Sequence, residues 1–220
     1  MPFLGDKNDT LPSFLDETPA DRGMGNENVG SGDQDIPRIS LLQNSSNQLR
    51  ELDDAKAGQF HNSVTNELLE NMVVVNLFYE KEWAIWRDQD LGGGFKGAFD
   101  SLEAAEAEIS TLPGNEADYQ ISETAKHACL LIDPETGVAK QPVMIYLKSS
   151  GLSASRNWNS QINAFNGDHP RFASLWLVSA GESSNKKGTW ASWKFSSLGW
   201  VPNAETYDTA KKFYETVSSK

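Results

Sequence analysis

The stretch that decides the fold runs from Gln141 to Trp200 and reads QPVMIYLKSSGLSASRNWNSQINAFNGDHPRFASLWLVSAGESSNKKGTWASWKFSSLGW. Residues 143–148 predict a strand with Val143, Ile145 and Leu147 on one face and Met144, Tyr146 and Lys148 on the other. Gly151 opens a helix of about twelve residues with a narrow apolar stripe, and the GDHP segment at 167–170 ends it. Two more strands, 172–179 and 189–195, form a hairpin. The order is therefore a strand, a helix and two strands.

Weaker patterns flank this stretch. Residues 38–42 resemble a short strand, and 127–132 form another. Residues 71–88 predict a hairpin that turns near Glu80-Lys81, and Ser101 caps a helix over 101–109. Residues 204–217 form an amphipathic closing helix. The predicted class is α+β, mostly β: an OB-like five- or six-stranded barrel with a helix before the last two strands, a helical insertion and a C-terminal helix. An irregular α+β sheet without a nucleic-acid role is the alternative.

Charge is divided unevenly along the chain. The net charge is −12, but residues 1–137 hold 26 acidic and 9 basic residues (−17), whereas residues 138–220 hold 5 acidic and 10 basic residues (+5). Residues 1–36 carry eight acidic residues, two basic ones and little apolar surface, which predicts a disordered acidic leader before a single domain over 37–220. The basic half suggests a surface that faces a polyanion, although a chance distribution explains it equally well.

Signatures of catalysis, metal binding and membrane insertion are missing from the sequence. The single cysteine, Cys129, sits in an apolar run and predicts a buried thiol, and one cysteine suits a reducing cytoplasm. The three histidines lack metal-ligand spacing, and no Ser/His/Asp order stands out. The start of the chain resembles no signal peptide, and no apolar run is long enough to span a bilayer. We expect a protein that is not an enzyme, uses no cofactor or metal and does not enter a membrane.

Aromatic residues beside cations recur instead, and five of the seven tryptophans lie in 141–200. Alternation along 189–195 separates Trp190 and Lys194 from Trp193, so that if the Trp193 face is the core, Trp190 is exposed beside a lysine. Cations neutralise phosphates and aromatic faces stack on unpaired bases. For any single tryptophan, burial is the more frequent outcome. The nucleic-acid-binding residues that this pattern predicts are Tyr146, Lys148, Arg156, Trp158, Lys186, Lys187, Trp190 and Lys194.

The segments KSSGLSASRNWNSQI (148–162) and NKKGTWASWKFSSLGWV (185–201) resemble a group of small tailed-bacteriophage proteins. PRISLLQ (37–43), GQFHNSVTNE (58–67) and TYDTAKKFYETV (206–217) extend the similarity over residues 37–217. The group is associated with the phage replication and recombination region and with single-stranded DNA binding. The resemblance implies that Lys148, Ser149, Arg156, Lys186, Lys187 and the neighbouring aromatics contact DNA. The acidic recruiting tail that such proteins usually carry at the C-terminus is not found here, so the leader would have to take its place.

The function expected from this resemblance is a non-catalytic protein that coats single-stranded DNA in the cytoplasm of the infected host cell. Its expected partners are single-stranded DNA and, through the leader, phage replication or recombination proteins; a homo-oligomer is left open. The alternative is a virion or assembly component whose leader and tryptophan-rich sheet make protein contacts. A small hydrolase or nuclease is a remote third hypothesis.

Overall fold

The computed structural model describes residues 24–30, 33–186 and 188–218. Contacts divide the chain into two units, Met1–Asp35 and Ile36–Lys220. Most of the predicted leader, 1–36, lies outside the described residues.

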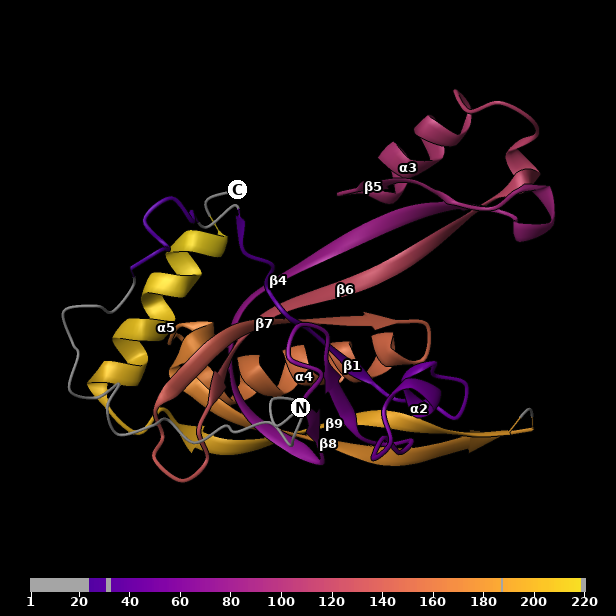
Figure 1. Cartoon of the computed structure of the whole chain (residues 1–220). Helices are drawn as coiled ribbons and strands as arrows, with labels where there is room; N and C mark the ends of the chain where they lie inside the picture. Colours follow the sequence, from indigo (N-terminus) through magenta and orange to yellow (C-terminus); the bar gives the residue numbers. More distant parts are fainter. Residues whose placement is uncertain (1–23, 31–32, 187, 219–220) are drawn as a thin grey trace. The chain divides into compact units, whose positions relative to one another are not determined.

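The second unit is α+β and mostly β, as predicted (Figure 1). The helix before the last two strands, the helical insertion and the C-terminal helix are all present. No described helix is both long and apolar enough to span a bilayer. In chain order the elements are β1 (Arg38–Leu41), α2 (Gln48–Glu51), β2 (Phe60–Asn62), β3 (Leu68–Leu69), β4 (Asn71–Arg87), η3 (Gln89–Leu91), β5 (Phe95–Phe99), α3 (Leu102–Ile109), η4 (Glu116–Asp118), β6 (Tyr119–Ile132), β7 (Ala139–Lys148), α4 (Gly151–Asn166), η5 (Arg171–Ala173), β8 (Ser174–Asn185), β9 (Gly188–Trp200) and α5 (Ala204–Val217).

One nine-stranded sheet forms the framework, in the order β3-β2-β1-β7-β6-β4-β8-β9, with β5 pairing to β4. All neighbours are antiparallel except β1 and β7, which run parallel. The sheet curls into a half-barrel. A side-chain amide links the segment after β1 to the edge strand β9: Gln43 Nε2 donates to the Ala191 carbonyl (3.0 Å), and the Ala191 N–H donates to Gln43 Oε1 (3.0 Å). A sheet of nine strands is larger than the predicted five- or six-stranded barrel, and OB-type details are not confirmed.

Helix α4 fills the inside of the curl, between β7 and the β8–β9 hairpin (Figure 1). Its inward stripe includes Trp158 and Ile162, which join the largest core cluster together with Val143, Ile145 and Leu147 of β7. The strand face predicted from alternation is therefore confirmed as core. Cys129 belongs to the same cluster and is buried, as expected.

Helix α5 covers part of the opposite face of the sheet. Its Ala210 is buried in a second cluster with Val75 and Leu77 of β4, and Tyr207 and Tyr214 pack around Phe172. Asn203 caps this helix by accepting a hydrogen bond from the Thr206 N–H. Both faces of the central strands are thus buried.

The distal halves of β4 and β6 leave the body of the unit as a long arm, seen at the upper right of Figure 1. The hairpin turn predicted near Glu80-Lys81 is wrong, because β4 continues without a turn for 17 residues. The arm has its own small core, in which Ile85, Ala105 and Tyr119 are buried between the strands and α3. Ser101 caps α3 as predicted.

A chain of buried polar groups connects the strands to α4. Arg171 Nε donates to Asn76 Oδ1, and the Asn76 amide donates to His127 Nδ1 (3.0 Å). His127 Nε2 lies 2.8 Å from Ser155 Oγ, so the neutral ring accepts at one nitrogen and donates at the other. Burial, with a further contribution from the Arg171 charge, lowers the pKa of His127 to about 3.

This pKa predicts a loss of stability on mild acidification. In the unfolded chain His127 takes up a proton near pH 6.5, whereas the folded ring stays neutral down to about pH 3. Its contribution to stability is therefore fully present above pH 6.5 and is lost progressively as the pH is lowered toward 3. Between pH 6.5 and 4.5 we expect His127 to lower the free energy of unfolding by about 2–3 kcal/mol. Urea titrations across this range measure it. His127→Gln should flatten the decline, and the exposed His169→Gln should not; equal slopes in all three proteins would contradict the assignment.

Candidate nucleic-acid interface

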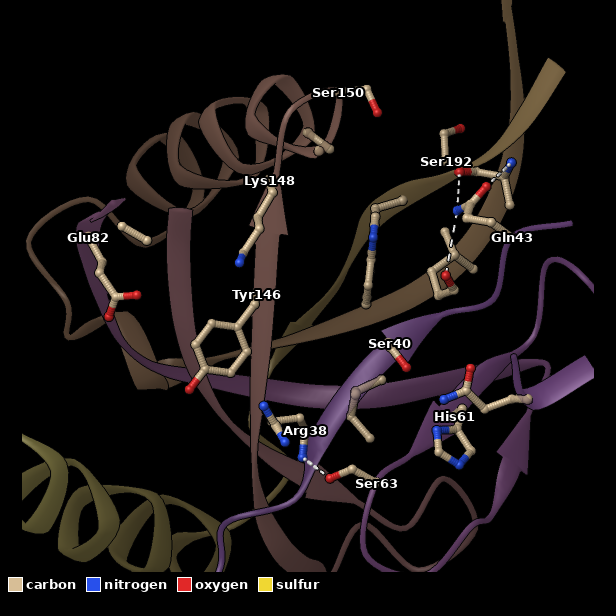
Figure 2. Close-up of a pocket in the computed structure, with 18 of the residues that line it drawn as sticks. Arg38, Ser40, Gln43, His61, Ser63, Glu82, Tyr146, Lys148, Ser150 and Ser192 are labelled. Carbon is tan, nitrogen blue, oxygen red and sulfur yellow. Dashed lines mark hydrogen bonds between the residues drawn. The ribbon is translucent and has the colours of Figure 1, made fainter. Parts of the chain in front are cut away.

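An open cleft of about 730 Å³ lies where the arm meets the body. Its lining comes from β1, α2, β2, β4, β5, β7, β9 and the start of α4, which are far apart in sequence. Figure 2 shows polar side chains around it, including Arg38 from β1, Tyr146 and Lys148 from β7, and Glu82 from β4. The curl of the sheet and the departure of the arm therefore create the cleft.

Two exposed aromatic rings line the arm side of the cleft. Trp86 of β4 pairs in register with Phe95 of β5, and their ring centroids lie 5.4 Å apart. Trp86 is 40% exposed and Phe95 is 55% exposed. Exposed neighbouring rings of this size are costly to leave in water, and their open faces are available for stacking.

Two cations line the same cleft, and one of them contacts a ring. Lys148 Nζ lies 5.6 Å from the centroid of the Trp86 ring, within the range of a cation–π contact. Arg38 is on β1, next to β7 in the sheet, and its backbone N–H donates to Ser63 Oγ (2.9 Å; Figure 2). Among the residues that the structure describes, neither Lys148 nor Arg38 forms a salt bridge. Both charges are thus available to an anionic ligand.

Glu82, the acidic residue of the cleft, forms an ion pair within the arm. Glu82 accepts an ion pair from Lys126 Nζ at 3.1 Å, and the same lysine also contacts Glu80. Lys81 on the other face of β4 pairs with Glu123 at 2.8 Å. These pairs cross between β4 and β6 and leave one net negative charge, because Glu80 and Glu82 share the single Lys126.

The structure brings together only part of the predicted site. Tyr146 and Lys148 line the cleft, and Ser149 follows them in the turn before α4, with φ at 49°. Arg156 lies on the exposed side of α4 and does not line the cleft.

The prediction that Trp158 stacks on bases is wrong. This side chain is 0% exposed and lies in the main core. Its ring stacks on Phe195 with centroids 4.0 Å apart and on His127 at 4.7 Å. The apolar stripe of α4 needs a large side chain to fill the half-barrel, and Trp158 supplies it.

The remaining predicted residues lie on the β8–β9 hairpin. Phe195 is buried and Trp193 packs against the same core, so the core face predicted for this strand is confirmed. Trp190 is half-buried and Lys194 is exposed on the other face, and Lys186 is exposed at the hairpin tip. Lys187 lies outside the described residues. None of these three described residues lines the cleft.

Sequence reasoning missed Arg38, Trp86 and Phe95. Alternation separates Trp86 from Trp83 on β4, and Trp83 indeed packs toward the core of the arm. That pattern could have marked Trp86 as the outward ring. Phe95 carries no comparable local signal, because its partner is set by the pairing of β5 with β4.

Comparison with known proteins gives one family. No curated protein matches the chain, and no solved structure matches it. A family model described as Pam3 phage gp34-like protein matches residues 5–220, nearly the whole chain. The chain therefore belongs to this family of bacteriophage proteins.

Proposed function

We propose that this protein binds single-stranded DNA without catalysing a reaction, coating it during phage replication or recombination. The observation that carries the proposal is the cleft, in which the exposed rings of Trp86 and Phe95 lie beside Lys148. Arg38 and Tyr146 add a second cation and a third ring to the same surface.

Unpaired bases are the ligands that such a surface fits best. Base–aromatic stacking contributes roughly 1–3 kcal/mol per base, and the faces it needs are hidden inside a duplex. Unpaired cations beside the rings would hold the phosphates between successive bases. Stacking on aromatic rings discriminates little between bases, which favours binding that tolerates any sequence.

The setting of the proposal is the cytoplasm of an infected host cell. Membership of a phage protein family supports a phage setting. In this proposal the acidic leader recruits replication or recombination proteins.

A virion or assembly protein is the second candidate, and the arm favours it. The arm has its own core of Ile85, Ala105 and Tyr119 and extends from the body, as a protein-contacting element would. DNA titrations separate the two candidates, because an assembly protein has no need to bind oligonucleotides.

Salt dependence and fluorescence test the DNA proposal. If Arg38 and Lys148 alone neutralise phosphates, log K for oligo-dT should fall against log salt with a slope of about −1.4. If Arg156, Lys186 and Lys194 also take part, the slope should approach about −3.5. Oligo-dT should also quench tryptophan fluorescence, because bases would cover Trp86.

A Trp86→Phe variant is the matched control for the quenching. It keeps a ring for stacking, so it should bind with similar affinity and lose much of the fluorescence change. A flat salt response without quenching in the wild-type protein would contradict DNA binding.

A further inference from the structure

At the root of the arm, one edge of strand β4 has no strand partner among the described residues. Strand β8 pairs with it over residues 71–75, and β5 pairs with it over residues 83–86. Between these two, residues 77–82 pair only with β6 on the other side, as far as the described chain goes. The sheet therefore has a break of about six residues, or roughly 20 Å at strand spacing, bounded by strands at both ends.

A cation without an acidic partner stands at one end of this break. Arg171 of η5 donates from Nε to Asn76 Oδ1 and from Nη2 to Asn159 Oδ1, both neutral amides. No carboxylate in the described part of the chain forms a salt bridge with it. Burial lowers the pKa of Arg171 to about 10, which leaves it charged at neutral pH. The two amides hold a partly buried guanidinium that still has N–H groups to donate.

An apolar pocket of about 480 Å³ adjoins the guanidinium. Leu77, Phe78 and Tyr79 of β4 form one wall, and Phe172 and Tyr214 form the other. Arg171 lines the same pocket, 5.6 Å from the centroid of the Tyr79 ring. A ligand that fits this site joins an anionic group to an apolar or aromatic side chain.

The charge along the edge also favours an acidic ligand. Arg156 of α4 is close enough to Lys81 of β4 for the two charges to interact. Lys81 is neutralised by Glu123, but Arg156 has no salt bridge among the described residues. Two uncompensated guanidinium groups, those of Arg171 and Arg156, thus lie near residues 77–82.

We propose that this break binds an extended acidic peptide of a partner protein, which adds as a strand to residues 77–82 of β4. The peptide backbone would pair with the unpaired edge of β4. One of its apolar side chains would fill the pocket, and one of its carboxylates would form an ion pair with Arg171. An open strand edge with an apolar pocket fits a polypeptide better than a nucleic acid, because nucleotides cannot continue a β-ladder. The inference does not rest on DNA binding in the cleft, because the cleft lining includes only Glu82 of residues 77–82 and neither Arg171 nor Arg156.

Fluorescence anisotropy with a labelled eight-residue peptide of alternating leucine and aspartate tests the proposal on the full chain. We expect saturable binding that weakens with salt. Two control peptides carry N-methyl groups on alternate amides. In one peptide the methyl groups block one edge of the strand, and in the other they block the opposite edge. Strand addition predicts that one isomer loses at least tenfold in affinity while the other keeps it, because only one edge faces β4. Equal binding of both isomers would overturn the proposal.

Protein variants locate the site. Arg171→Gln should weaken peptide binding at least tenfold, and Lys140→Gln, a surface lysine paired with Asp133, should not change it. Circular dichroism checks that Arg171→Gln remains folded. If this variant unfolds, the two methylated peptides still test strand addition on the wild-type protein. Unlabelled oligo-dT should leave the peptide bound. Displacement of the peptide by oligo-dT at matched ionic strength would assign the break to nucleic acid and overturn the proposal.

Discussion

Replacing Trp158 by alanine is expected to lower the free energy of unfolding by about 3–5 kcal/mol, the range for large-to-small changes at fully buried aromatic positions. The ring fills the half-barrel, stacked between Phe195 and His127 with an edge toward Trp176. No side chain can move far enough to close a space of that size without disturbing the curl of the sheet. Urea denaturation followed by circular dichroism measures the change.

Trp190→Ala is the matched control for Trp158→Ala. Trp190 lies outside the main core on the half-buried face of β9, so its removal should change stability much less. A loss below about 1 kcal/mol for Trp158→Ala, or equal losses for both variants, would contradict the packing of α4 in the half-barrel.

Local patterns predicted the body of the unit well where one face of an element is buried. The alternation of Val143, Ile145 and Leu147 predicted the core face of β7 because its other face carries more polar side chains. The same argument placed Phe195 inward on β9. Helix α4 was predicted from its stripe and from the glycine that follows it at 167.

The same reasoning failed where β4 enters the arm, because Glu80 and Lys81 are exposed on its two faces. Glu80, Lys81 and Glu82 resemble a turn because three consecutive charged residues seldom occur in a half-buried strand. In the structure their charges pair across to Lys126 and Glu123 of β6, and β4 continues through them. Those partners lie about 40 residues away, so no local pattern could predict them.

The candidate site was only partly predictable for the same reason. Tyr146 and Lys148 were found because they alternate with core residues on one strand. Arg38 and Phe95 join them only through the pairing of β1 with β7 and of β5 with β4. Trp158 was assigned to the site because a tryptophan beside an arginine looks the same in sequence whether its ring packs inward or outward.

Replacing Trp86 by alanine is expected to weaken single-stranded DNA binding by about 1–3 kcal/mol, or roughly 5- to 150-fold in Kd. Trp86 is the largest exposed ring of the cleft and lies against both Phe95 and Lys148. Its removal takes away a stacking face and frees the lysine from its cation–π contact. Because the ring is 40% exposed, thermal stability should change little. Titration of labelled oligo-dT at fixed salt measures the loss.

Trp200→Ala provides the control, because Trp200 is 49% exposed but packs on Phe165 and His169 and does not line the cleft. It should bind oligo-dT like the wild-type protein. A double-mutant cycle with Lys148→Gln then asks whether the ring and the cation act together. The 5.6 Å contact between them predicts that the double variant loses less than the sum of the two single losses, because each single change already disturbs the same contact. Equal affinities for Trp86→Ala and Trp200→Ala would place the DNA-binding surface outside the cleft, whatever the salt dependence.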